Sequence, residues 1–590
     1  MSIQRANRRA VSGLLAALGL ASPALAQSLS TPVVPPSSDL SAPPLGAPAD
    51  LRDSLVPVLP GSAPQGPANY GEPTPRFKLP KPNPPLRRYF GAPRRGRLAL
   101  PPLEAYKSSA VARRLLRRTL KPGETPPEIP PTVATTPTIK TKARPRPVPE
   151  PYSPIGIGVG SLRLMPFVEV SSGYEDNPDR LPSLSPLQAI AAGVPGAATP
   201  VGSTFVRGDA GFSLKSPDWE RNDLRGDLRV GYVDYFDYPE ASRFDGAGNV
   251  AARYDVTRDT AIDVTGRATY DTLRPYSQQL IQTVTQTSGG TATTSTVETP
   301  QNRPSVVTTG TTAGVTQKFN RLEVTLRGSY DRVMYGDAYY SSLGPPPIAG
   351  PDAGNVFPLS GTSYNDFGGT ARVAYEIDPH VKPFAEATYD LRVHDSFLDP
   401  YGEARDSNGV LARGGVEVKF SDLLKGDAAG GYTERAYAQR SLSQRLYAEA
   451  AYGTPAYESQ LPELRGATVD ADLIYTPTPL TTVTLRAVTT VAETTTTGAS
   501  GVFSHAFSAQ LSHDLLRNLS VTALGTYYTN NYQGASIVEH GYTAGVKLDY
   551  KLTRSVSLRA SYSHERLNSS YGPIADYTAN VYTVGLRFQQ

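Results

Sequence analysis

The sequence predicts an all-β protein, a transmembrane antiparallel β-barrel of about 18 strands (16–20), preceded by a disordered proline-rich segment. Three observations support this fold class. The chain starts with a basic and then apolar export signal. From residue 156 onward, many segments alternate apolar and polar residues with a period of two. The connections between these segments are short turns and long loops in alternation, as in outer-membrane barrels.

The first 26 residues have the features of a secretory signal peptide. Basic residues precede an apolar run at 11–21, and Ala24-Leu25-Ala26 fits the small-residue cleavage pattern. The run is too short to span a bilayer as a helix. The absence of Cys excludes disulfides, thiolate metal sites, a Cys nucleophile and an acylated Cys anchor. We therefore expect an exported chain whose signal peptide is residues 1–26.

Residues 27–155 contain more than half of the chain's 55 prolines, and basic residues there outnumber acidic ones. Proline removes a backbone donor and fixes φ, so neither helix nor sheet can extend through runs such as Arg144-Pro145-Arg146-Pro147-Val148-Pro149. We expect a disordered, basic, periplasmic arm. Peptidoglycan or polysaccharide-export components are the partners that such an arm would meet.

A short helix is expected at 103–120 within the arm. Arg113, Arg114, Arg117 and Arg118 fall on one side of a helical projection, opposite Val111, Leu115, Leu116 and Leu120. This pattern is typical of a basic amphipathic helix that binds an anionic membrane, a cell-wall polymer or a partner. A solvated helix in a linker is the other interpretation, because a helix of this length is marginal alone.

Residues 156–590 are expected to form the barrel. In the last segment Tyr582, Val584, Leu586 and Phe588 share one face, and Thr583 and Arg587 the other. The same alternation appears at 321–331, 384–394, 467–475, 542–552 and 556–565. A strand of this kind lies between two environments, which in a membrane barrel are lipid and the polar lumen. Tyrosine is abundant, at 34 residues, and tyrosines at strand ends are expected to form girdles at the headgroup level.

The connections indicate which end of the barrel is outside. Short turns are predicted at 217–222, 320–321, 378–380, 517–518 and 553–555. Long connections are predicted at 175–202, 274–303 and 336–363. Long loops lie outside the cell in such barrels. An even strand number then returns residue 590 to the periplasm, with the last strand closing on 161–174.

Two motifs resemble a known family. They are Pro166-Phe167-Val168-Glu169-Val170 followed by Tyr174-Glu175-Asp176-Asn177-Pro178, and Thr476-Pro477-Thr478-Pro479-Leu480-Thr481-Thr482. These residues resemble the putative β-barrel porin 2 family, over roughly residue 156 to the end. The resemblance implies a bacterial outer-membrane barrel, often linked to exopolysaccharide secretion, without catalytic residues. Gln589 and Gln590 after Phe588 depart from the aromatic residue that usually ends such barrels.

The polar face of the strands supplies the candidate site, a charged lumen. The candidate lumen-lining residues are Arg225, Asp227, Arg229, Glu323, Arg327, Asp331, Glu386, Asp390, Arg392, Asp470, Asp472, Arg486, Lys547, Asp549, Arg559 and Arg587. About 18 strands enclose room for water unless loops fill the interior. The interpretation is a porin-like passive conduit for small solutes, which could serve polysaccharide export. The alternative is a structural barrel tethered through its arm to the cell wall or an inner-membrane partner.

Enzymatic chemistry is not expected. His394 and Asp390 share a polar face and form the one arrangement compatible with a barrel hydrolase, but a charged rung of the lumen explains them equally well. Asp176-Asn177-Pro178 is interpreted as a turn at a strand end, not as a cation site. No cofactor, metal or nucleic acid is expected. The expected partners of the barrel are outer-membrane lipid and the machinery that inserts barrels.

Overall fold

The computed structural model describes residues 152–590, with gaps at 183, 186, 189–199, 217–221, 276–279, 281, 289–291, 341–355, 440, 442, 448–460, 497 and 572–574. The signal peptide predicted at 1–26, the helix predicted at 103–120 and the arm predicted at 27–155, apart from its last four residues, lie outside the described residues.

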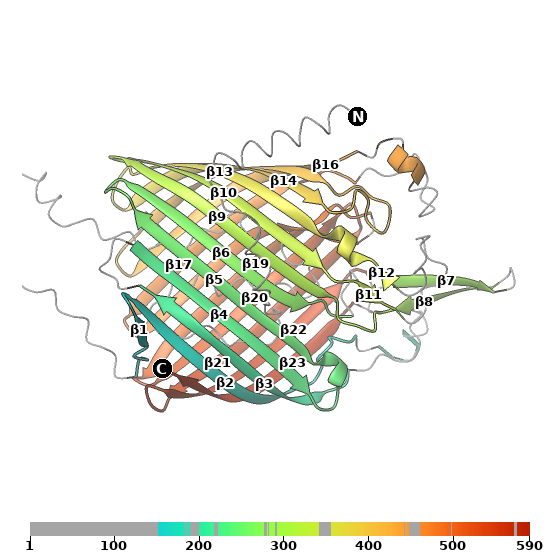
Figure 1. Ribbon diagram of the computed structural model, residues 1–590, viewed down its shortest axis with the longest axis horizontal. Coiled ribbons are helices and arrows are strands. Elements are labelled where there is room, and N and C mark those ends of the chain that lie inside the picture. Colours follow the sequence, from blue (N-terminus) through green and yellow to red (C-terminus); the bar gives the residue numbers. More distant parts are fainter. Residues whose placement is uncertain are drawn as a thin grey trace, which may run out of the picture. The chain divides into compact units, whose positions relative to one another are not determined.

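Eighteen antiparallel strands form one closed barrel, as the sequence predicts (Figure 1). The strands are β2 (Leu162–Glu175), β3 (Ser203–Lys215), β4 (Asn222–Tyr235), β5 (Arg243–Asp255), β6 (Thr260–Thr272), β9 (Ser305–Phe319), β10 (Leu322–Tyr335), β13 (Tyr364–Tyr375), β14 (Val381–His394), β15 (Ser407–Lys419), β16 (Leu424–Tyr437), β17 (Leu464–Thr478), β18 (Thr481–Ala492), β19 (Gly501–Leu516), β20 (Leu519–Gln533), β21 (Ile537–Lys551), β22 (Val556–Ser569) and β23 (Tyr577–Gln589). Each pairs with the next along this list, and the short β1 (Ile157–Val159) pairs with β2.

The barrel closes where β23 pairs with β2. The ladder runs from Phe167 opposite Gln589 to Glu175 opposite Val581. Gln590 continues this ladder, because its N–H donates to the Pro166 carbonyl at 3.2 Å. On the other side of β23, the Gln589 N–H donates to the Ser555 carbonyl, just before β22, at 2.9 Å. The closure pairs the two terminal strands of the barrel, as a β-structure that crosses a membrane requires. The ladder between β17 and β18 ends at Asp470 opposite Val488.

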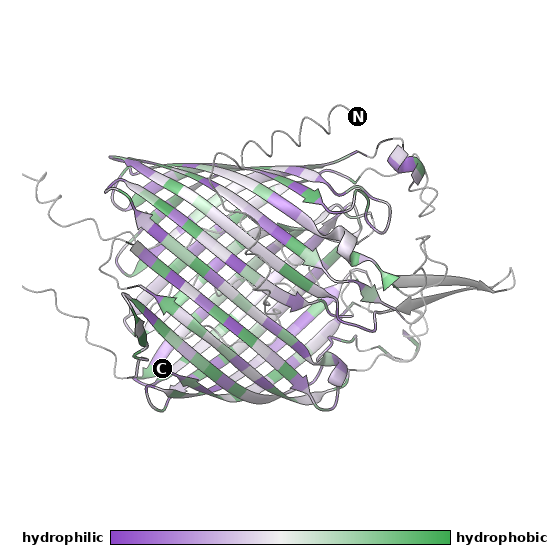
Figure 2. Cartoon of the chain, viewed as in Figure 1, coloured by the Kyte–Doolittle hydropathy of each residue, from purple (hydrophilic) through white to green (hydrophobic). Residues whose placement is uncertain are grey.

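Hydrophobic and hydrophilic residues alternate along the barrel strands (Figure 2). The exposures show which set faces outward. In β23, Val584 is 57% exposed, whereas Arg587 is 2% exposed. The apolar side chains are the exposed ones because the outer surface of a membrane barrel meets lipid, not a second sheet. Among the described residues, no helix is long and apolar enough to cross a membrane.

The two ends of the barrel differ as predicted. At one end the strands are joined by tight turns, such as Asn320-Arg321 between β9 and β10. At the other, outer end the connections at 176–202, 273–304, 336–363, 395–406 and 438–463 are long. Small elements lie within the outer connections: the hairpin β7 (Gln282–Ser288) and β8 (Ala292–Glu298), the pair β11 (Ala338–Tyr339) and β12 (Val356–Phe357), and the 3-10 helices η3 (Pro239–Ala241) and η4 (Leu359–Thr362).

A charge on the outer face should destabilise the barrel. We expect Val584→Arg, near the middle of β23, to lower the free energy of unfolding by about 2–4 kcal/mol, because the guanidinium must enter hydrocarbon. Thr583→Arg, whose side chain faces the interior, should lower it by less than half as much. Urea titration in phosphatidylcholine vesicles, followed by gel mobility, measures both. Equal losses for the two variants would contradict the assignment of the faces.

Candidate functional site

The candidate site is the interior of the barrel. The structure places every candidate lumen-lining residue on the face opposite the exposed apolar side chains, and none of them is an exposed residue. Partly buried positions are Arg225, Asp227, Arg229, Glu323 and Arg327; buried positions are Asp331, Glu386, Asp390, Arg392, Asp470, Asp472, Arg486, Lys547, Asp549, Arg559 and Arg587. Strand parity alone therefore predicts on which face of the wall each of these side chains lies.

Arginines on the interior wall bridge carboxylates of neighbouring strands. Arg207 lies 2.9 Å from Asp209 and 2.7 Å from Asp245, so that it links β3 to β5. Arg229 of β4 contacts the same Asp209 at 2.9 Å. Because each guanidinium has five donors in a planar fork, it can satisfy two carboxylates at once.

The same bridging recurs elsewhere on the wall. Arg413 lies 2.7 Å from Glu386 and 3.0 Å from Asp470. Arg559 contacts Glu169 at 2.8 Å and Asp549 at 2.9 Å. Sequence reasoning did not single out Arg207, Arg413 or Glu169. The alternation of β3, β15 and β2 carries the signal that would have found them.

Access to the interior differs between the two ends. Near the tight turns, Glu323 is 21% exposed although Lys318 and Lys382 lie within 3.3 and 2.9 Å. At the outer end, the charged side chains of Arg392 and Asp366 are at most 1% exposed. Water therefore reaches charges at the tight-turn end of β10 and β14, whereas Lys547, Asp549 and Arg559 at the same end of β21 and β22 are buried. Charges at the outer end are packed.

Two outer connections are held inside the outer end by Arg405. Its Nε donates to Asp399 at 2.6 Å and its Nη2 to Glu403 at 2.9 Å, both in the connection 395–406. Its Nη1 donates to the carbonyls of Thr494 at 2.7 Å and Ala499 at 3.1 Å, in the connection 493–500. One buried guanidinium thus joins two loops that are about 90 residues apart in the chain.

A second arginine links this pair of loops to the wall. Arg392 of β14 forms ion pairs with Asp366 of β13 and with Glu493. Its guanidinium also lies 4.8 Å from the centre of the Tyr364 ring. Burial alone would raise the pKa of the Glu493 carboxyl, but the positive charges of Arg392 and Arg405 hold that pKa below its ordinary value of 4.5. The carboxylate is therefore strongly favoured over the acid.

The connection between β2 and β3 has an anchor of its own. Arg180 forms an ion pair with Glu175 and lies 3.0 Å from Glu565 of β22. The Tyr577 hydroxyl donates to the same Glu565 at 2.6 Å. Three connections at the outer end are therefore tied to the interior wall by buried arginines.

Several tyrosines face the interior and therefore do not belong to a lipid-facing girdle. Tyr527 is 47% exposed on the outer face, while its neighbour Tyr528 is fully buried on the inner face. An apolar cluster inside the outer end contains Leu273, Leu280, Val306, Val333, Tyr335, Ala338, Tyr340, Phe357, Leu359 and Tyr364, with Tyr401 packed against it. Loop and wall side chains share this cluster.

The comparison of sequences decides the family. The profile of the family described as Putative beta-barrel porin 2 matches residues 150–446 and 447–590. The chain belongs to this family. No curated protein sequence matches this beta-barrel porin. Its family and its closed, outward-apolar barrel place it in the outer membrane.

Several solved outer-membrane structures are similar in fold to this beta-barrel porin. The outer membrane protein opdK from Pseudomonas aeruginosa shares 11% identity, with 72% of this chain and 99% of that chain covered, at a TM-score of 0.32. OccAB3 from Acinetobacter baumannii shares 10% identity, with 73% and 100% covered, at 0.32. The ferric enterobactin receptor of P. aeruginosa, in complex with enterobactin, shares 10% identity, with 72% and 81% covered, at 0.36.

The residues considered for catalysis are not in contact. The Nδ1 of His394 lies 3.3 Å from the Asp406 carboxylate, and its ring packs against Tyr364. Asp390 instead forms an ion pair with Arg435. Asn177 accepts a hydrogen bond from the Leu181 N–H at 2.7 Å, as a turn residue does. In the part of the chain that the structure describes, no three His, Asp or Glu side chains are grouped so as to hold a metal ion.

The ion pairs of Glu493 predict that acid loosens the outer mouth of this porin. Because the pKa of Glu493 is lowered in the folded chain, its contribution is present above pH 4.5 and is lost as the pH falls through the lowered value. Hydrogen exchange of the connection 493–500 should accelerate at least tenfold in that acid range, corrected for intrinsic rates. Glu493→Gln should show the fast exchange already at pH 7, whereas the exposed Glu434→Gln should not. Exchange that is unchanged in Glu493→Gln would contradict the anchoring role.

Proposed function

We propose that this beta-barrel porin is a passive conduit for small hydrophilic solutes across the outer membrane, with an outer mouth narrowed by its own loops. The observation that carries the proposal is the difference in access along the interior. Charged side chains at the periplasmic end of β10 and β14 are partly exposed, whereas those at the outer end are packed with loop residues.

The charges of the interior suit small polar solutes of either sign. Arg207, Arg229 and Arg413 lie beside carboxylates, so positive and negative groups alternate around the wall. A lumen of mixed sign offers hydrogen-bond donors and acceptors without a strong field of one sign. Such a wall supports passage of small polar molecules and only weak selection between cations and anions.

The narrow outer mouth rests on few side chains. Arg405 has partners in both the connection 395–406 and the connection 493–500, and its partner Glu403 accepts a further hydrogen bond from the Gly498 N–H at 3.0 Å. Removing one member of a buried ion pair costs about 3–5 kcal/mol, because the remaining charges stay buried without a counter-ion. This is enough to release a loop from the mouth without unfolding the barrel, whose strands are held by their own backbone ladders.

Arg405→Ala should therefore produce a larger unit conductance in planar bilayers. Without this guanidinium, three buried carboxylates lose a counter-ion, which favours loop conformations outside the mouth. These carboxylates are Asp399, Glu403 and Glu493. The matched control is Lys419→Ala, which removes an exposed ion pair with Asp422 at a periplasmic turn and should conduct as the parent does. Equal conductance of Arg405→Ala and the parent would contradict the role of the loops.

The same recordings separate the conduit from its alternatives. Block of the current by soluble polysaccharide, applied from the periplasmic side, would support the more specific role in polysaccharide export. A correctly inserted barrel that is silent in both the parent and Arg405→Ala would contradict the conduit. That outcome would favour the structural barrel tethered through its basic arm to the cell wall or an inner-membrane partner.

A further inference from the structure

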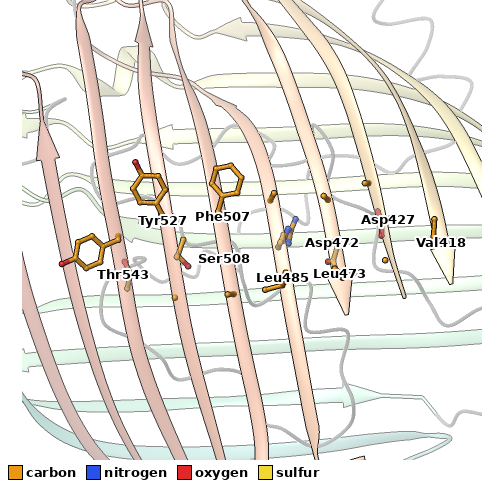
Figure 3. Close-up of a pocket in the computed structure, with 18 of the residues that line it drawn as sticks. Val418, Asp427, Asp472, Leu473, Leu485, Phe507, Ser508, Tyr527 and Thr543 are labelled. Carbon is orange, nitrogen blue, oxygen red and sulfur yellow. The ribbon is translucent and has the colours of Figure 1, made fainter. Parts of the chain in front are cut away.

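An apolar groove lies on the lipid-facing side of the wall, across β15 to β21. Its volume is ≈ 840 Å³. Outward-facing small residues form much of it, namely Ala428, Ala471, Ala487, Ala509, Gly525 and Ala544. Larger side chains border it, and Figure 3 shows Phe507 and Tyr527 side by side on adjacent strands.

The groove ends at an aromatic row. Ala509, Gly525 and Ala544 are directly paired neighbours on β19, β20 and β21. Two residues closer to the outer end of the same strands lies the paired row Phe507, Tyr527 and Tyr542. Rings at this position mark the boundary between hydrocarbon and headgroups in a membrane barrel.

A polar row lies two residues further towards the outer end. His505, Thr529 and His540 are directly paired, and their side chains face outward. His505 Nδ1 lies 2.9 Å from the Thr489 hydroxyl, and His540 Nδ1 lies 3.3 Å from the Tyr527 hydroxyl. The two imidazoles are therefore held by neighbouring hydroxyls, in defined orientations.

The polar row is part of a second pocket, of ≈ 350 Å³. The other polar side chains that line it are Arg465, Asn531 and Gln533. Arg465 lies 3.2 Å from Glu434 and also forms an ion pair with Glu463, so its charge is largely balanced. The exposed cation Arg566 of β22 is paired with Tyr542 of the aromatic row. Its guanidinium donates at 3.4 Å to Asn568, which is paired with His540 of the polar row.

We propose that the outer face of β17 to β22 binds one phosphorylated glycolipid of the outer leaflet, with an acyl chain in the apolar groove and the head group in the polar pocket. Along the same three strands, small residues are followed by aromatic rings and then by His, Thr and amide side chains. This order matches that of acyl chain, interface and sugar head in a lipid of that leaflet. Imidazole, hydroxyl and amide groups bind sugar hydroxyls, and Arg566 lies where it can bind a phosphate.

A lipid fits this surface better than a second copy of the chain. A groove of small residues beneath a ridge of rings is concave, whereas a two-fold contact requires a surface that is complementary to itself. The polar pocket would also have to be buried against protein in such a contact, at a cost in desolvation. The proposal concerns the lipid-facing side of the wall and does not depend on passage through the lumen.

Native mass spectrometry of the full chain in detergent tests the site, with bisphosphorylated lipid A as the probe. We expect one lipid A per chain, at about tenfold higher affinity than dephosphorylated lipid A, because hydrogen bonds to a charged phosphate are strong. A similar preference is expected over phosphatidylglycerol, which has a phosphate but no sugar hydroxyls for the polar pocket. Arg566→Gln should remove the preference for the phosphorylated form. Equal binding of phosphatidylglycerol by the parent chain would overturn the assignment of a glycolipid head.

A matched pair of glycine variants tests the groove. A Cβ at Gly525 and a Cβ at Gly369, on the outer face of β13, both have no atom within 4 Å, so both leucine variants should fold. Gly525→Leu enters the groove and should weaken lipid A binding by about tenfold, since the acyl chain loses apolar contact. Gly369→Leu should bind as the parent does. Equal binding by both variants would overturn the proposal. A Gly525→Leu chain that no longer dimerises but still binds lipid A would also overturn it, because the groove would then be a contact between two copies of the chain.

Discussion

The structure depends on one constraint: every backbone N–H and C=O within the membrane must be paired, because hydrocarbon offers no partner. The first and last strands of the barrel, β2 and β23, meet this constraint by pairing with each other, from Phe167 opposite Gln589 to Glu175 opposite Val581. Once the ladder is closed, the direction and parity of every strand are set. Inward and outward positions, the ends that carry long loops, and the place of each charged residue all follow from that closure.

Closure explains the strands but not the outer mouth, where side chains and not the backbone ladder determine the arrangement. The loops there have few ladder hydrogen bonds and are held by buried guanidinium groups, such as Arg180 between Glu175 and Glu565. A buried ion pair contributes little net stability relative to apolar packing, but breaking one is costly. Such pairs therefore specify one arrangement of the loops more than they stabilise the barrel. The strands can stay intact while the mouth changes.

The alternation of residues allowed much of the fold to be predicted from the sequence. The strand number, the tight turns and the inward side of residues such as Asp472 and Arg559 follow from a period of two. This period is a local pattern, because residues two positions apart in a strand share a face. Contacts between loops do not follow from it. Arg405 and Thr494 are 89 residues apart, and no local pattern indicates that one donates to the other. Nor did the shared polar face of His394 and Asp390 predict their partners, which are Asp406 and Arg435.

The tyrosines show why composition is a weaker guide than parity. Tyr527 and Tyr528 are adjacent in β20, yet one ring is exposed to lipid and the other is buried inside the barrel. The same residue type has two roles, because a ring with one polar atom suits both a headgroup boundary and a packed interior that contains charges. Inside, Tyr235 and Tyr577 bind the carboxylates that hold Arg180. Outside, Tyr527 is hydrogen-bonded to His540. Since consecutive residues face opposite sides, the lumen and the lipid-facing surface can be specified independently by the same strands.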